Sequence, residues 1–189
     1  MKWKYVFIGA SLLLGACQPM GNKQADATKP STETVSKDKK ETSGSKKVVE
    51  ASFKTFDGKT VNLSDYKGKK VYIKVWASWC PTCLAGLPEV DSLADIDSFA
   101  ANHSEDTVVL SVVAPGVNRE KKAEDFKEWF SGLEYKNLPV LMAETPDFFK
   151  QVGVIGYPTS VFINQNGEIV QAHPGHLSNE DIQKQLDKM

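Results

Sequence analysis

The chain has 189 residues with 23 basic and 24 acidic side chains, which gives a formal net charge of −1 at pH 7. Residues 48–189 taken alone hold 14 basic and 20 acidic side chains, a net charge of −6. This acidic balance gives no support to nucleic-acid binding, because that function requires a basic surface. Three cysteines occur in the chain, at positions 17, 80 and 83.

Residues 1–16 have the pattern of an export signal. Lys2 and Lys4 precede an apolar run over 6–14, which is too short for a membrane span. The sequence Leu14-Gly15-Ala16-Cys17 resembles a bacterial lipobox, which implies cleavage before Cys17 and attachment of a lipid to its sulfur. The alternative is an ordinary secretory signal with a cysteine near the cut. Both interpretations place the protein outside the cytoplasm, and lipidation would anchor it to the cell membrane, facing outward.

Residues 17–47 are predicted to form a flexible linker that begins at the lipid anchor. Positions 18–47 carry seven lysines and four acidic side chains with almost no apolar ones, so they cannot bury enough surface to offset their chain entropy. About 30 such residues would reach roughly 30 Å, which lets the domain meet partners in the membrane and just above it. The basic charge could contact an anionic membrane surface, but we favour a solvated linker.

The folded domain is predicted over residues 48–189, a usual size for one domain. In its first half the sequence predicts a hairpin with strands at 49–55 and 60–63 around Asp57-Gly58. A buried strand at 71–76 and a long helix from Pro81 to Leu93 follow. Pro88 lies inside this helix and predicts a kink there, because an interior proline removes a backbone hydrogen bond.

The second half alternates strands and helices before a late hairpin. The predicted elements are a strand at 107–113, a helix at 122–130, an extended segment at 138–142, a helical turn at 146–152, a hairpin of 160–164 and 168–172, and a helix at 178–188 capped by Ser178 or Asn179. This order predicts a mixed α/β sandwich and argues against a doubly wound sheet.

The motif Trp79-Cys80-Pro81-Thr82-Cys83 directly follows the predicted strand 71–76. Two cysteines three apart on the first turn of a helix can close a small disulfide. The first sulfur also faces the unpaired N–H groups and the positive end of the helix dipole, which favours the attacking thiolate form. We therefore predict a catalytic Cys80–Cys83 pair that needs no cofactor, with Pro81 and Thr82 as possible tuning residues.

A zinc site is the alternative for a C-x-x-C pair. Such a site would need two further ligands, whereas Cys17 is already assigned to the lipobox. The histidines are His103, His173 and His176, and the last two could in principle offer a pair. A dithiol that directly follows a core strand is more typical of redox chemistry, so we expect no metal.

A second motif, Gly153-Val154-Ile155-Gly156-Tyr157-Pro158-Thr159, precedes the predicted strand 160–164. Together with the C-x-x-C motif it resembles the thioredoxin superfamily. The resemblance implies a three-layer α/β sandwich with a central mixed sheet, an N-terminal hairpin and a helical insertion. It also implies that Pro158 is cis and packs against the cysteines, and that the backbone of Tyr157 pairs with the substrate. Because Trp79 and Tyr157 flank the site on the two motifs, we predict them, with Pro158, as substrate-docking residues. The alternative is that Pro158 merely starts an edge strand.

The stretch 76–83, the leading hairpin and the Pro158 segment together resemble the TlpA/ResA-like extracytoplasmic branch. That branch reduces disulfides outside the cytosol and is recharged by a membrane electron conduit of the CcdA/DsbD type. Residues 72–80 and segments of 114–140 are similar to the thioredoxin domains that supply electrons to secreted methionine sulfoxide reductases. The resemblance implies a monomeric reductase with such a partner. The alternatives are a reductase of apocytochrome c or other exported proteins in cytochrome c maturation, a disulfide-forming oxidase, and a binding module on the same scaffold.

Lys74 departs from the superfamily pattern. Cytosolic thioredoxins carry a buried aspartate six residues before the first cysteine, where it accepts the proton of the second. A lysine in a core strand is costly unless its amine reaches solvent or loses its proton. Lys74 is therefore either an amine that tunes the dithiol or a strand-end lysine that reaches solvent. How Cys83 loses its proton stays open, and Glu89 is the nearest acid in sequence.

Overall fold

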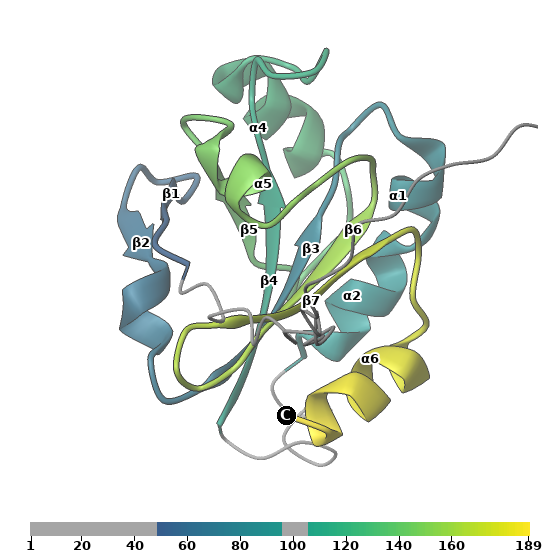
Figure 1. Ribbon diagram of the computed structural model, residues 1–189. Helices are drawn as coiled ribbons and strands as arrows, with labels where there is room; N and C mark the ends of the chain where they lie inside the picture. The colour runs from purple at the N-terminus through teal and green to yellow at the C-terminus, as the bar shows by residue number, and fades with distance from the viewer. Residues whose placement is uncertain (1–48, 96–105) are drawn as a thin grey trace, which may run out of the picture. The chain divides into compact units, whose positions relative to one another are not determined.

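The computed structural model describes residues 49–95 and 106–189 (Figure 1). The predicted export signal, the lipidation residue Cys17, the linker and His103 lie outside the described residues. The described residues form an α/β domain around a seven-stranded mixed sheet with the strand order β2-β1-β5-β4-β3-β6-β7.

Strand β3 (Lys70–Val75) is an interior strand of the sheet and leads into the C-x-x-C motif. It pairs in parallel with β4 (Thr107–Val113) and antiparallel with β6 (Thr159–Ile163). On the β4 side the sheet continues in parallel with β5 (Val140–Met142), and on the β6 side it ends with antiparallel β7 (Ile169–Pro174). Helices cover both faces of β3, and this explains its nearly continuous buried run.

The predicted N-terminal hairpin is present with shorter strands, β1 (Ser52–Lys54) and β2 (Thr60–Asn62). Gly58 has a φ of 82° in the turn between them, a conformation that favours glycine. Lys54 pairs with Met142, which joins the hairpin to β5. A 3₁₀ turn, η1 (Leu63–Tyr66), then leads to β3.

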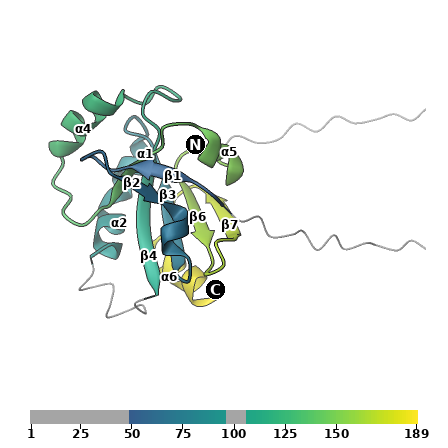
Figure 2. The same cartoon turned by 90° about the vertical axis from the view of Figure 1, so that its left-hand side faces the viewer.

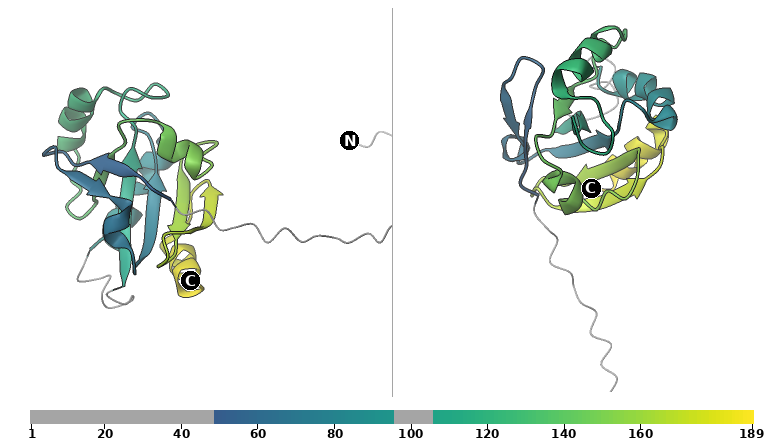
Figure 3. Two further views of the ribbon diagram at one scale, coloured as in Figure 1. Left: turned by 60° about the vertical axis from the view of Figure 1, so that its left-hand side comes forward. Right: turned by 90° about the horizontal axis from the view of Figure 1, so that it is seen from above.

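Two layers of helices enclose the sheet (Figures 2 and 3). One face carries α1 (Pro81–Ala85), α2 (Leu87–Leu93), α4 (Ala123–Ser131) and α6 (Asn179–Asp187), and the other carries η1 and α5 (Asp147–Gln151). Because side chains alternate along a strand, Tyr72 and Trp76 pack in the first layer, and Ile73 and Val75 pack in the second. The three-layer fold with α4 as its helical insertion confirms the prediction.

Helix α4 packs against the chain just after β3. The Phe126 and Phe130 rings lie 5.7 Å and 6.2 Å from the ring of Trp76, measured between centroids. All three side chains are buried. Aromatic pairs at these separations add stability beyond their buried area. The contact therefore fixes the start of the loop that carries the cysteines.

The predicted single helix over 81–93 is wrong in one respect. The helix breaks at Gly86, which separates α1 from α2, two residues before the predicted kink at Pro88. The break places Pro88 in the first turn of α2, where a missing N–H group leaves no intrahelical partner unsatisfied. The proline therefore starts a new helix and does not bend an existing one.

The remaining predicted elements are confirmed, with ends shifted by no more than three residues. The last helix, α6, is capped by Ser178, one of the two predicted capping residues. The Ser178 hydroxyl accepts a hydrogen bond from the backbone N–H of Asp181 over 3.2 Å.

Candidate active site

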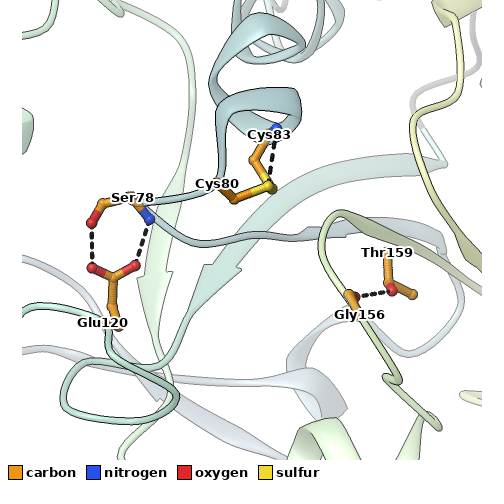
Figure 4. Close-up of a disulfide and its surroundings, with 6 residues drawn as sticks. All are labelled: Ser78, Cys80, Cys83, Glu120, Gly156 and Thr159. Carbon is orange, nitrogen blue, oxygen red and sulfur yellow. Dashed lines mark hydrogen bonds between the residues drawn. A yellow bond between two sulfur atoms is a disulfide. The ribbon is translucent and has the colours of Figure 1, made fainter.

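Cys80 and Cys83 form a disulfide at the start of α1 (Figure 4). Cys80 is the capping residue with an extended backbone, and Pro81 takes the first helical position, which its fixed φ suits. The backbone N–H of Cys83 donates a hydrogen bond to Cys80 Sγ over 3.2 Å. Cys80 is 5% exposed, whereas Cys83 is fully buried. An incoming partner therefore meets Cys80 first. Thr82, the other predicted tuning residue, is exposed.

The Pro158 segment lies beside this loop because β6 pairs with β3 in a register that sets Thr159 opposite Val75. The Tyr157–Pro158 peptide bond is cis, as predicted. The Thr159 hydroxyl donates a hydrogen bond to the Gly156 carbonyl over 2.7 Å, which closes the turn before the strand (Figure 4). Two segments separated by about 75 residues of chain thus meet at the loop that carries the cysteines.

The open side of the site has an aromatic border. Trp79 is 40% exposed and meets the ring of Tyr157 edge to face, with centroids 5.7 Å apart. Arg119 places its guanidinium carbon 4.8 Å from the Trp79 ring centroid. Asn118 donates a side-chain hydrogen bond to the Tyr157 hydroxyl over 3.3 Å. The loop after β4 therefore contacts Trp79 and Tyr157, two of the three predicted docking residues.

Asn118 and Arg119 adopt a backbone conformation that is uncommon outside glycine. Their φ angles are 49° and 66°. Non-glycine residues in this region persist where surrounding contacts determine the conformation, and they concentrate at functional sites. Sequence analysis did not identify either residue, because a strained loop conformation leaves no local sequence pattern.

Glu120 is a buried carboxylate that sequence analysis also missed. It accepts hydrogen bonds from the backbone N–H and the hydroxyl of Ser78 (Figure 4), and from the backbone N–H of Lys121 over 2.7 Å. These bonds hold the loop after β4 against the loop that carries the cysteines. From the sequence alone, a glutamate between Arg119 and Lys121 is expected to be one of several solvent-exposed charges.

Lys74 is buried in strand β3, beneath Gly86. Its side chain is 1% exposed, which rules out the interpretation that it reaches solvent as a strand-end lysine. A Cβ atom placed on Gly86 would lie 3.1 Å from Lys74 Nζ and 2.6 Å from His176 Nδ1. Gly86 follows Cys83 by one helical turn and donates its backbone N–H to the Cys83 carbonyl. The amine therefore lies under the helix break, next to the turn that holds Cys83.

The charge state of Lys74 is set by burial. Desolvation lowers its pKa from 10.5 to about 8, while the nearby Glu89 carboxylate acts in the opposite direction. Glu89 also pairs with His176, with 3.0 Å between Oε2 and Nε2. The structure thus brings Lys74, Glu89 and His176 together beneath α1 and α2. A lysine with this pKa has a minor neutral fraction at pH 7, and a neutral amine can accept a proton.

The described residues contain no group of three His, Cys, Asp or Glu side chains that could hold a metal ion. The two histidines considered as a pair lie in different surroundings, with His176 against Glu89 and His173 on β7 opposite Ser160. Within residues 49–95 and 106–189, no helix is both long and apolar enough to cross a bilayer.

Comparison with known families is decisive for the classification. The family described as Redoxin matches residues 28–188, which is most of the chain. The chain belongs to the redoxin family. This redoxin is also similar to the pneumococcal exposed lipoprotein thioredoxin Etrx1 from Streptococcus pneumoniae, with 45% identity and a TM-score of 0.68. That similarity covers 75% of this redoxin and 100% of the other chain.

Two curated relatives extend the comparison. This redoxin is 40% identical to an uncharacterized protein of Haemophilus influenzae over 75% of its own length and 86% of the relative. It is 28% identical to the thiol-disulfide oxidoreductase ResA of Geobacillus thermodenitrificans over 70% of each chain. These similarities confirm the predicted membership of a TlpA/ResA-like thioredoxin family. This redoxin is a thioredoxin-like thiol–disulfide oxidoreductase, a class that works through a redox-active cysteine pair and needs no cofactor.

Proposed function

We propose that this redoxin is a lipid-anchored disulfide reductase that works outside the cytoplasm and donates electrons to a methionine sulfoxide reductase. The observation that carries the thiol–disulfide exchange chemistry of this proposal is the asymmetry of the cysteine pair. Cys80 keeps 5% of its surface exposed and accepts a backbone hydrogen bond at its sulfur, whereas Cys83, three residues further along, is fully buried. One sulfur is thus placed to attack a partner and the other to resolve the product.

The proposed reaction has two exchange steps. The Cys80 thiolate attacks one sulfur of the substrate disulfide, forms a mixed disulfide and releases the other substrate sulfur as a thiolate, which takes up a proton. Cys83 then loses its proton, attacks Cys80 Sγ and releases the second substrate thiol. Two electrons pass to the substrate, and the enzyme is left with the Cys80–Cys83 disulfide. A membrane thiol donor of the CcdA/DsbD type would reduce that disulfide again.

Lys74 is the base that we propose for Cys83. Burial lowers the pKa of Lys74 to about 8, so a fraction of the amine is neutral near pH 7 and can accept a proton. The amine lies next to the helical turn that holds Cys83. Lys74→Met should slow decay of the mixed disulfide about tenfold without slowing its formation. Lys70→Met, at the other end of β3, is the control. Equal effects on both steps would contradict this role.

The proposed location depends on Cys17 and the sequence before it. Leu14-Gly15-Ala16-Cys17 resembles a lipobox, and the similar Etrx1 protein is described as an exposed lipoprotein. Metabolic labelling with a radioactive fatty acid should mark the wild-type protein and fail to mark Cys17→Ser. Labelling of the variant would contradict the anchor.

The proposed partner is tested by trapping the mixed disulfide. Cys83→Ala leaves Cys80 without its resolving thiol, so the covalent complex with the substrate should accumulate on the cell surface. Cys80→Ala is the matched control, because it removes the attacking thiol and should capture nothing above background. Mass spectrometry of the captured protein should identify a methionine sulfoxide reductase. Capture of an apocytochrome c instead would favour cytochrome c maturation and overturn the proposed partner.

The direction of electron flow is tested by the reduction potential. A reductase requires a potential well below that of a strong disulfide-forming oxidant, which is about −120 mV. Equilibration of the Cys80–Cys83 pair with glutathione buffers, read out by tryptophan fluorescence, measures it. A value near that of the oxidant would reverse the proposed flow.

A further inference from the structure

The loop that follows β4 carries the one arginine of the 189-residue chain. All other basic side chains except the histidines are lysines. Arg119 stands against Trp79, the residue directly before Cys80, with 4.8 Å between the guanidinium carbon and the ring centroid. A guanidinium stacked on an aromatic face keeps its N–H groups free at the edge, where a carboxylate can bind in a two-pronged geometry.

On this loop the acidic side chain is buried and the basic side chains are exposed. Residues 119–122 read Arg-Glu-Lys-Lys, but Glu120 points inward and is bound to Ser78 and Lys121. Arg119, Lys121 and Lys122 are exposed. The loop therefore presents three cations to solvent, of which Arg119 stands against Trp79 beside the cysteines, although residues 48–189 together carry a net charge of −6.

Arg119 is also free to bind a partner. Within the described residues no carboxylate forms an ion pair with Arg119, and its guanidinium stacks on the ring of Trp79. Its position is fixed on both sides, because Asn118 bonds the Tyr157 hydroxyl and Glu120 bonds the loop carrying the cysteines. A preorganised and unpaired cation next to a nucleophile suits recognition of an opposite charge on the substrate.

We propose that Arg119 selects disulfides whose attacked cysteine is flanked by an acidic side chain. The inference rests on the proposed reductase function and specifies its substrate class. The bound carboxylate would pair with the guanidinium edge while the substrate sulfur approaches Cys80. Because the pair forms at a solvent-exposed edge, it should act on the rate of encounter and weaken as salt is added.

The experiment uses three synthetic nonapeptides that each contain one intramolecular disulfide. They differ in the residue next to each cysteine, which is Asp, Asn or Lys. Stopped-flow fluorescence gives the rate constant at which each peptide oxidises the reduced full-length enzyme. Each value is divided by the rate with dithiothreitol, because neighbouring charge also changes the intrinsic reactivity of the disulfide.

The wild-type enzyme should prefer the Asp peptide over the Lys peptide by about tenfold at low salt, and the preference should shrink in high salt. Arg119→Ala should lose the preference, so that its rates with the Asp, Asn and Lys peptides lie within about twofold of one another, because the charge contact is removed. Arg119→Glu should reverse the preference toward the Lys peptide, an outcome that misfolding cannot produce. Lys67→Ala, an exposed charge change away from the site, should preserve the wild-type order.

The outcomes separate the two levels of the proposal. Reduction of all three peptides without a charge preference, or a preference that survives in Arg119→Ala, overturns the role of Arg119 and leaves the reductase function standing. Failure of the reduced wild-type enzyme to react with any peptide overturns the reductase function and, with it, this inference.

Discussion

Cys80 and Cys83 belong to the same helical turn, yet their surroundings have opposite properties. On the Cys80 side, Trp79 and Arg119 are exposed, and the contacts come from loops. On the Cys83 side, Lys74 is buried under the break between two helices. The exposed residues near Cys80 can adapt to the substrate, whereas the buried residues near Cys83 must serve proton transfer in the cysteine pair. Recognition and proton handling can thus be altered separately, and the variants below test that separation.

The largest expected effect concerns the contact between the loop after β4 and the loop that carries the cysteines. Glu120→Gln replaces a buried carboxylate that accepts three hydrogen bonds. The NH₂ group of the glutamine would face at least one of the N–H or O–H groups that donate to the carboxylate, so a hydrogen bond would be lost there. The variant should therefore lose about 3 kcal/mol of unfolding free energy. Urea unfolding of the oxidised protein measures the loss.

Glu124→Gln is the matched control for that substitution. Glu124 is an exposed residue whose 2.9 Å ion pair with Lys127 lies on the surface of α4. Such pairs contribute little, so the control should change the free energy by about 0.5 kcal/mol or less. A similar loss in both variants would show that Glu120 does not hold the loop.

The next effect concerns the buried side and its dependence on pH. The pKa of Lys74 falls from 10.5 in the unfolded chain to about 8 in the fold, so folding is penalised below pH 8 and the penalty disappears as pH rises toward 10.5. Lys74→Met lacks the penalty. It should be more stable than wild type by about 2 kcal/mol at pH 7, and the gap should close toward pH 10.

Urea titrations of both proteins between pH 7 and pH 10 measure that gap. The series stops at pH 10 because burial raises the pKa of Tyr72 to about 12, and stability from the neutral tyrosine is lost as the pH rises from 10 toward 12. A gap that stays constant over the series would show that the Lys74 amine is not desolvated in the fold.

The smallest expected stability effect comes from the glycine at the helix break. Gly86→Ala places a methyl group 2.6 Å from His176 Nδ1 and 3.1 Å from Lys74 Nζ, so it should destabilise the protein by about 1–2 kcal/mol. Gly132→Ala is the control, because its nearest neighbour is the Trp129 carbonyl at 3.4 Å. Differential scanning calorimetry should show a lower Tm for the first variant alone. Equal Tm values would mean that the space under the helix break is not filled.

The features that could be predicted from sequence are those carried by neighbouring residues. The C-x-x-C pair, the proline that starts its helix and the cis bond before Pro158 each belong to a continuous motif. The strands were predictable because β3 and β6 are apolar runs with clear turns on either side. These local patterns were sufficient for the fold and for the position of the redox pair.

The features that could not be predicted depend on contacts between distant segments. Glu120 is buried because Ser78, 42 residues away, donates to it. Gly86 ends α1 where Lys74 and His176 fill the space that a side chain would need. Lys74 itself was noticed, but sequence could not decide between a solvent-reaching and a buried amine. Arg119 gave no local signal, because its place against Trp79 depends on the path of the loop.

The central claim is that Cys80 is the attacking thiol and Cys83 the shielded one. Iodoacetamide labelling of the reduced full-length protein at pH 7, with the modified cysteine located by mass spectrometry over time, tests this directly. The account predicts that Cys80 is alkylated at least about tenfold faster than Cys83, because thiolate character and access both favour it. Equal rates, or faster labelling of Cys83, would contradict the account.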